Sequence, residues 1–174
     1  MVKRTSIVFI ILLLAASLTR AQSSVPSDTK ITLERSTDAF GNGANYELTI
    51  KSDGTVTFKR FANPVLDVSD PRAREMPLLQ AKIPVETVAA LVAEFDLVKF
   101  FSLNDRYAKN EDGCPGGVWT DNSYAEVSIT VNGKSKSIVH YHGCFDENHR
   151  SYPVELTALE LKIDELVNSK QWLK

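Results

Sequence analysis

Residues 124–144 read YAEVSITVNGKSKSIVHYHGC and predict a β-hairpin. In the first eight residues, apolar and polar side chains alternate, which is typical of a strand with one buried face. Asn132-Gly133 is the strongest short turn signal in the chain, because both central positions of a type I′ turn need a positive φ angle. The stretch therefore predicts two antiparallel strands joined by a two-residue turn.

The length of this turn fixes which residues lie opposite each other. The predicted pairs are Val127 with Ile138, Ala125 with His140, and Tyr124 with Tyr141. His140 is then expected on the apolar face beside a small residue, and His142 on the same side. This position is more typical of a structural histidine than of a metal ligand.

The rest of the chain predicts an α+β fold. Strands are expected at residues 31–35, 46–50, 55–61 and 78–83, the last as an edge strand because prolines bracket it. Apolar residues at helical spacing predict one helix over residues 85–95 and a second that begins at Pro153. The expected architecture is one antiparallel sheet of about five or six strands, with both helices packed on one face.

The turn after the second predicted strand contains Asp53 and Gly54. A three-residue loop with Gly54 in the left-handed conformation, a G1 bulge, matches the apolar pattern better than a two-residue loop. The pairs it predicts are Ile50 with Val56, Leu48 with Phe58, and Glu47 with Lys59.

The first residues predict a signal peptide. Lys3 and Arg4 precede an apolar run at residues 7–16, and small residues at 19–21 suit cleavage before Gln22. The apolar run is shorter than the roughly 20 residues that span a bilayer, so no membrane span is expected in the mature chain. The expected division is a signal peptide at 1–21, a flexible leader at 22–30 and a single α+β domain at 31–174, exported to the periplasm or beyond the cell.

The charge balance excludes two classes of partner. The whole chain has 20 basic and 22 acidic side chains, a net charge of −2, and the predicted signal peptide removes only basic residues. The acidic excess is spread along the chain. A basic groove for nucleic acid and a polybasic membrane patch are therefore not expected.

The two cysteines of the chain, Cys114 and Cys144, most simply form a disulfide in an exported protein. The bridge would close a loop of about 30 residues and contribute roughly 3–4 kcal/mol to stability. A metal-bound or free pair is the alternative.

The order of these elements resembles an uncharacterised family of exported bacterial domains, a domain of unknown function. The resembling segments are residues 31–35, 46–50, 52–58, 94–95, 100–103 and 132–136. Many such proteins carry a Cys-x-Gly-x-Cys-Pro-x-Tyr run before the second strand, where residues 39–46 here read AFGNGANY. Gly41 and Tyr46 match that run, and both cysteines are absent. The resemblance implies a fold and a location outside the cytoplasm, and no activity.

A metal site is the sharpest functional alternative. His140 and His142 share a strand face, Cys144 follows them, and Cys114 or His149 would complete a zinc or copper site. The cysteines are better used as a disulfide in an oxidising compartment, so the main expectation is that no cofactor is bound.

An acid–base enzyme is a second alternative, with His140 or His142 as base and Asp146, Glu147 or Asp121 orienting it. No nucleophile motif is present, and no catalytic residue is predicted.

Calcium is a third alternative, in the loop that contains Asp105, Glu111, Asp112, Gly113 and Asp121. Their spacing does not follow the EF-hand pattern, and such a loop is usually only solvated.

The favoured interpretation is a non-catalytic binding or structural module. The aromatic residues Trp119, Tyr107, Tyr124 and Tyr141 lie around the two loops that the disulfide would join. They would form a patch for a protein or glycan partner if they are exposed, and core packing if they are not.

Overall fold

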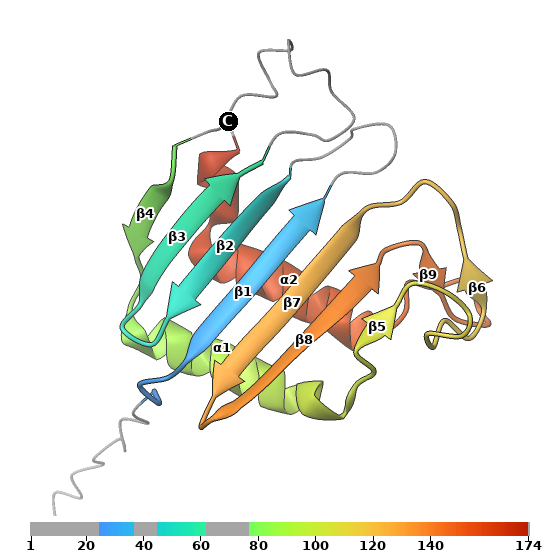
Figure 1. The fold of residues 1–174 in the computed structure, drawn as a ribbon, viewed down its shortest axis with the longest axis horizontal. Helices are drawn as coiled ribbons and strands as arrows, with labels where there is room; N and C mark the ends of the chain where they lie inside the picture. Colours follow the sequence, from blue (N-terminus) through green and yellow to red (C-terminus); the bar gives the residue numbers. More distant parts are fainter. Residues whose placement is uncertain (1–24, 37–44, 62–76, 174) are drawn as a thin grey trace, which may run out of the picture.

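The computed structural model describes residues 25–36, 45–61 and 77–173 (Figure 1). The predicted signal peptide, the start of the predicted leader and most of the run that lacks the family's cysteines lie outside these residues. The strands are β1 (Lys30–Ser36), β2 (Tyr46–Lys51), β3 (Thr55–Arg60), β4 (Leu79–Lys82), β5 (Arg106–Tyr107), β6 (Gly117–Val118), β7 (Tyr124–Val131), β8 (Lys134–Tyr141) and β9 (Cys144–Phe145). The helices are α1 (Val85–Leu97) and α2 (Val154–Val167), with short 3-10 helices at Phe100–Ser102 and Ser169–Trp172.

The predicted α+β class is confirmed, with two differences in the sheet. Within the described residues, the main sheet has seven strands in the order β4-β3-β2-β1-β7-β8-β5 rather than five or six, and β6 pairs with β9 in a separate sheet. The main sheet is also mixed, because β5 runs parallel to β8 while its other pairs are antiparallel. Strands of two residues, such as β5 and β6, are too short to show the alternation from which strands are predicted.

The registers of both predicted hairpins are confirmed. The β7–β8 hairpin pairs Val127 with Ile138, Ala125 with His140 and Tyr124 with Tyr141. The β2–β3 hairpin pairs Ile50 with Val56, Leu48 with Phe58 and Glu47 with Lys59. Gly54 has a φ angle of +81°, the left-handed conformation that the bulged turn requires.

Both helices lie behind the main sheet in the view of Figure 1 and cover its inner face. The side chains that fill the space between sheet and helices are almost all apolar. The fully buried ones of largest volume are Phe58, Phe95, Phe100, Ile31, Leu33, Leu48, Ile50, Leu91, Ile129, Ile138, Leu156 and Leu159.

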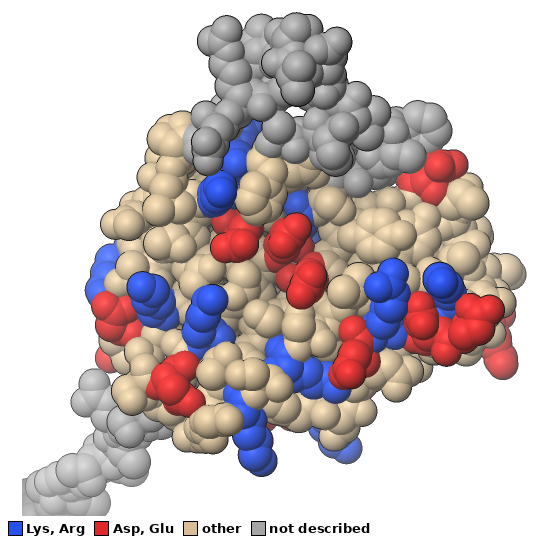
Figure 2. All heavy atoms as spheres, viewed as in Figure 1, with Lys and Arg blue, Asp and Glu red and all other residues tan. Residues whose placement is uncertain are grey.

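Neither helix of the described residues covers the outer face of the sheet, and this face is polar. Figure 2 shows acidic side chains gathered on this face, with basic side chains around them. The strand register explains why these acidic side chains gather, because Glu34 on β1 lies between Glu47 on β2 and Glu126 on β7. Partial burial and the repulsion of Glu126 and Glu47 raise the pKa of Glu34.

The predicted disulfide is confirmed. Cys114 and Cys144 are bonded, with their Cα atoms 5.4 Å apart, and both are buried. The bond joins β9 to the loop that precedes β6. Among the described residues, no helix has the length and apolar character needed to cross a bilayer.

The last residues of the predicted leader contact the domain. The Asp28 carboxylate accepts hydrogen bonds from the backbone N–H groups of Asn132 and Gly133, at 3.1 and 2.6 Å. The leader thereby reaches the β7–β8 turn just before β1 begins.

Candidate functional site

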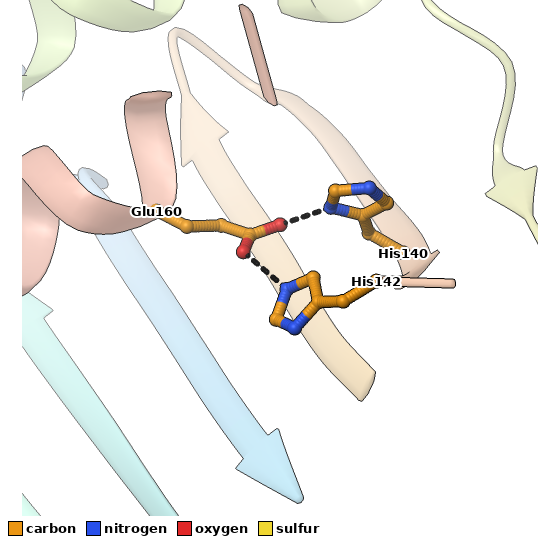
Figure 3. A group of neighbouring side chains, drawn as sticks. All are labelled: His140, His142 and Glu160. Atoms are coloured by element: carbon orange, nitrogen blue, oxygen red, sulfur yellow. Dashed lines mark hydrogen bonds and ion pairs between the residues drawn. The ribbon is translucent and has the colours of Figure 1, made fainter. Parts of the chain in front are cut away.

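Two histidines and a glutamate meet between the end of β8 and α2 (Figure 3). His140 Nδ1 lies 2.6 Å from Glu160 Oε1, and His142 Nε2 lies 2.8 Å from Glu160 Oε2. The ligand atoms of the three residues all lie within 4.8 Å of one another. We call these residues the His–Glu cluster.

Each member is placed by the local structure of its own segment. The hairpin register puts His140 on the inner face opposite Ala125, where the small side chain leaves room for the ring. His142 follows β8, and its backbone N–H donates to Ser123 O at 2.9 Å. Glu160 lies one helical turn after Leu156 on the buried face of α2.

Glu160 is held as a carboxylate despite its burial. Burial alone would raise its pKa, but hydrogen bonds from His140 and His142 and their charge lower the pKa of Glu160 to about 2. Because its pKa is so low, Glu160 keeps its negative charge near neutral pH and can face a cation.

The outer ring nitrogens of both histidines also have partners. His140 Nε2 lies 3.2 Å from Tyr152 O, and His142 Nδ1 lies 2.7 Å from Ser123 Oγ. Tyr152 O and the Glu160 carboxylate can only accept hydrogen bonds, so His140 must donate from both ring nitrogens while it contacts both. His142 must donate to Glu160 from Nε2, and its Nδ1 accepts from Ser123 in the neutral ring and donates to Ser123 in the charged ring.

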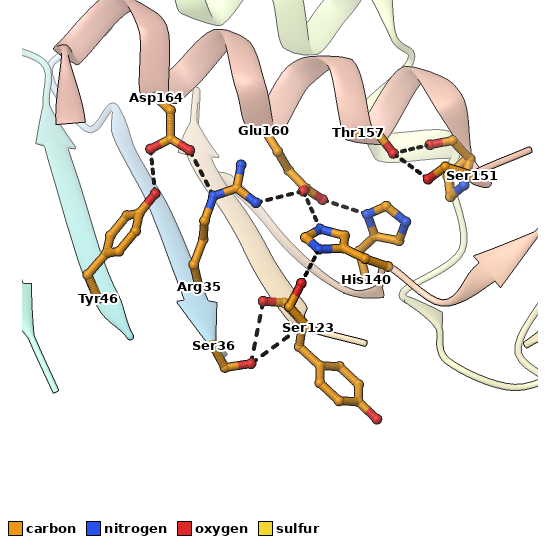
Figure 4. Close-up of polar contacts among 12 residues, drawn as sticks. Arg35, Ser36, Tyr46, Ser123, His140, Ser151, Thr157, Glu160 and Asp164 are labelled. Carbon is orange, nitrogen blue, oxygen red and sulfur yellow. Dashed lines mark hydrogen bonds and ion pairs between the residues drawn. The ribbon is translucent and has the colours of Figure 1, made fainter. Parts of the chain in front are cut away.

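An arginine extends the cluster along the sheet (Figure 4). Arg35 Nη1 lies 3.3 Å from Glu160 Oε2, and Arg35 Nε donates to Asp164 Oδ2 at 2.7 Å. Tyr46 Oη donates to Asp164 Oδ1 at 2.6 Å. Burial opposes the charge on Arg35, but the carboxylates of Asp164 and Glu160 raise its pKa. Burial and the carboxylate of Asp164 raise the pKa of Tyr46 as well.

A groove of about 650 Å³ opens beside this network. Side chains from the ends of β1 and β7 form one wall, and side chains from α2 and the following 3-10 helix form the other. The lining residues are Arg35, Ser36, Tyr46, Ser123, Tyr124, His142, Leu161, Asp164, Glu165, Asn168, Ser169, Lys170 and Leu173. The network therefore fixes several polar groups of the groove wall.

The structure changes the ligand set of the predicted metal site. It brings His140 and His142 together but removes Cys114 and Cys144, because both sulfur atoms are used in the disulfide. His149 packs against Trp119 and Phe145, with ring centroids 6.2 and 5.3 Å apart, and is not a member of the His–Glu cluster.

The predicted aromatic patch is divided between the surface and the interior. Trp119 and Tyr124 are 46% and 41% exposed, whereas Tyr107 and Tyr141 are buried. The buried hydroxyls have partners: Tyr107 Oη accepts from the N–H of Asn104, and Tyr141 Oη donates to Trp119 O at 2.7 Å. The four rings therefore do not form one exposed surface.

The acidic residues proposed to orient a histidine base are engaged elsewhere or lie outside the cluster. Asp146 pairs with Arg150 and accepts backbone hydrogen bonds within its own loop, which lower the pKa of Asp146. Glu160 takes the orienting position instead.

The predicted calcium ligands do not converge either. Asp105 pairs with Lys136, and Asp112 with Arg106. In the described part of the chain, the His–Glu cluster is the one group of three or more His, Cys, Asp or Glu residues that could hold an ion.

Sequence reasoning missed Arg35 and Glu160, although each carried a signal. Arg35 has the same strand parity as Ile31 and Leu33, so its side chain had to face the core. Glu160 lies four residues after Leu156 and three before Ile163, which places it on the apolar face of the helix. A charged residue at an inward position requires a partner.

Comparison with known proteins gives a family and no activity. No curated protein matches the chain. A family described as a domain of unknown function (DUF6438) matches residues 29–167, which span β1 to the end of α2 and include every member of the His–Glu cluster. On this match, the chain belongs to the DUF6438 family of domains of unknown function.

Proposed function

We propose that this protein is an exported, non-catalytic binding module that holds a saccharide in the groove beside α2. The observation that carries the proposal is the groove itself. Its volume of about 650 Å³ falls within the range of small-molecule sites, and ion pairs already hold its polar wall in place. A wall ordered before binding lowers the entropic cost of holding a ligand.

The charges of the lining favour an uncharged ligand. Arg35 and Lys170 are matched by Asp164 and Glu165, so neither sign dominates. The lining also includes residues with hydroxyl or amide groups, which are Ser36, Ser123, Asn168 and Ser169. Such a lining offers donors and acceptors in similar number, which suits the hydroxyl groups of a sugar.

An aromatic ring at the rim supports the same ligand class. Tyr124 is 41% exposed and lines the groove. Its ring packs on Tyr141, with centroids 4.6 Å apart, and the Tyr141 hydroxyl is fixed by Trp119 O. Tyr124 therefore presents a supported apolar surface next to polar groups, which is the combination that small-ligand sites use for contact area and orientation.

The test compares two exposed aromatic residues in different places. Titration of ¹⁵N-labelled protein with a panel of mono- and disaccharides and short peptides should shift the amide signals of Ser36, Ser123 and Tyr124. Tyr124→Ala should weaken binding of the responding saccharide by about tenfold or more, the loss expected for a ring that carries part of a binding hot spot.

Trp119→Ala is the matched control, because Trp119 is as exposed as Tyr124 and lies among the loops joined by the disulfide. It should leave the saccharide affinity nearly unchanged, while the loss of the stacking on Phe145, with ring centroids 4.4 Å apart, should lower the melting temperature slightly. Loss of binding in Trp119→Ala but not in Tyr124→Ala would move the site to those loops and contradict the groove. Binding of peptides alone would contradict the saccharide.

Export is tested separately by intact mass. The expected protein, secreted with its own first residues, begins at Gln22 and is two hydrogens lighter than its reduced form. A mass that retains residues 1–21 would contradict the signal peptide.

A further inference from the structure

We propose that His140, His142 and Glu160 bind a divalent ion of the zinc type. The proposal goes beyond saccharide binding and does not depend on it. Two imidazole nitrogens and one carboxylate are among the ligand sets that hold zinc with an open position for water. Imidazole also suits copper(II), whereas the soft sulfur ligands that select copper(I) are absent from the described residues around the site, because both cysteines of the chain are disulfide-bonded.

The three ligand atoms are already gathered. They lie within 4.8 Å of one another, so little movement is needed for an ion to contact all of them. Figure 3 shows both rings directed at the Glu160 carboxylate, His140 from β8, His142 from just beyond it and Glu160 from α2. Two of the ligands, His140 on a strand and Glu160 on a helix, are more precisely held than ligands on loops, and His142 begins the turn that directly follows β8.

The outer partners of the two rings match those of metal-bound histidines. A metal-ligating histidine usually donates its other ring N–H to a carbonyl, carboxylate or similar acceptor. Tyr152 O lies 3.2 Å from His140 Nε2, and Ser123 Oγ lies 2.7 Å from His142 Nδ1. With an ion bound at Nδ1 of His140 and Nε2 of His142, each ring keeps one N–H, and each N–H already has its acceptor.

The neighbouring charges are compatible with a cation. Arg35 is the nearest basic side chain among the described contacts of Glu160, at 3.3 Å from Oε2. Its Nε pairs more closely with Asp164, at 2.7 Å, so the arginine charge is shared between two carboxylates and only partly offsets that of Glu160. Glu160 is then left as the negative group that an ion neutralises.

The experiment uses the full chain in its secreted, disulfide-bonded form, carrying no histidine tag. After removal of metals with a chelator, Zn²⁺ is titrated calorimetrically, and Co²⁺ is titrated while its visible absorption bands are followed. One equivalent of each ion should bind, and Co²⁺ should give the intense bands of a four- or five-coordinate site.

Three variants and one control test the ligand assignment. Glu160→Gln and His142→Ala should each lower the Zn²⁺ affinity by more than the roughly 10–100-fold expected of the outer variant Ser123→Ala. His142 is 23% exposed, so His142→Ala should remain folded even if Glu160→Gln does not. His149→Ala, outside the cluster, should bind Zn²⁺ as the unchanged protein does.

Ring tautomers give an independent readout. Without metal, His142 should carry its proton on Nε2, facing Glu160, and with Zn²⁺ the proton should move to Nδ1, facing Ser123. Nitrogen-15 shifts of the imidazole report this directly. Failure of Zn²⁺ and Co²⁺ to bind in a saturable 1:1 ratio would overturn the proposal, as would equal affinity in folded His142→Ala. Saccharide shifts measured in metal-free protein would still decide the groove separately.

Discussion

Two rows of side chains cross the same inner face of the sheet and have opposite character. The first, the apolar row, joins Val56, Ile50, Ile31 and Ile129 on adjacent strands, and all of them are buried. The second, the polar row, joins Tyr46, Arg35, Ala125 and His140, and it faces Glu160 and Asp164 on α2.

The difference between the rows separates stability from function. Burying an isoleucine stabilises a fold by about 1.5–3 kcal/mol, without further requirements. Burying a charge is costly, and its partners often only offset that cost, so apolar replacements of similar volume are frequently as stable or more so. The apolar row is sufficient to explain how the sheet and helices pack. The polar row borders a groove, and functional sites are the places where proteins break such local packing rules.

The largest effect is expected in the apolar row. Ile31→Ala should lower the free energy of unfolding by about 4 kcal/mol, because the central strand leaves little room to close the cavity. Urea unfolding measures the loss, and Ile31→Val should cost only about 1 kcal/mol. Zn²⁺ affinity at low temperature should not change. A coupled loss of Zn²⁺ affinity in both variants would show that the rows are not independent.

Breaking the polar row from one side comes next. Glu160→Gln should cost about 3 kcal/mol in metal-free protein, because the charges of Arg35 and the histidines lose their buried partner. The fall in the urea midpoint measures this cost, provided that the m value is unchanged. A cost below about 0.5 kcal/mol, the size of a surface ion pair, would contradict the burial of a charged Glu160.

A single hydrogen bond tests the far end of the polar row. Tyr46→Phe keeps the ring that stacks on Phe58, with centroids 5.0 Å apart, and removes the hydroxyl that donates to Asp164. The expected cost is about 1.5 kcal/mol, that of a hydrogen bond to a charged group. An unchanged unfolding curve would mean that Arg35 alone satisfies Asp164.

The smallest effect lies on the outer face, where solvent screens charges. Glu34 has a raised pKa, so its ionisation costs stability as the pH rises from its ordinary value of 4.5 through the folded value. Glu34→Gln should remove that loss and add about 0.5 kcal/mol at pH 7, after allowance for exposure. The gain should vanish below pH 4. It should also shrink in 1 M salt, where the screening length falls to about 3 Å. If the gain in stability persisted at low pH, it would not come from the removal of the Glu34 charge.

Local patterns predicted local structure well. Asn132-Gly133 set the register that brought His140 to the inner face, and the cysteine pair formed the expected bond. The polar contacts of the cluster could not be predicted from local pattern. Glu160 lies 20 residues after His140 on another element, and Arg35 is 125 residues from Glu160, so they meet only when α2 packs on β1 and β8. Tyr107 and Tyr141 follow the core-packing alternative for the aromatic residues, and their hydroxyls find backbone partners inside the fold.

The central claim, that the polar row serves a site rather than stability, is tested most directly by a double variant. His140→Leu with Glu160→Leu replaces the buried pair by apolar side chains. Arg35 and His142 also lose Glu160, but each is partly exposed and keeps its second partner, Asp164 or Ser123. Urea unfolding of metal-free protein should give a free energy equal to or above that of the unchanged chain, while Zn²⁺ binding is lost. A double variant less stable by about 2 kcal/mol or more would contradict the claim and make the pair a structural element.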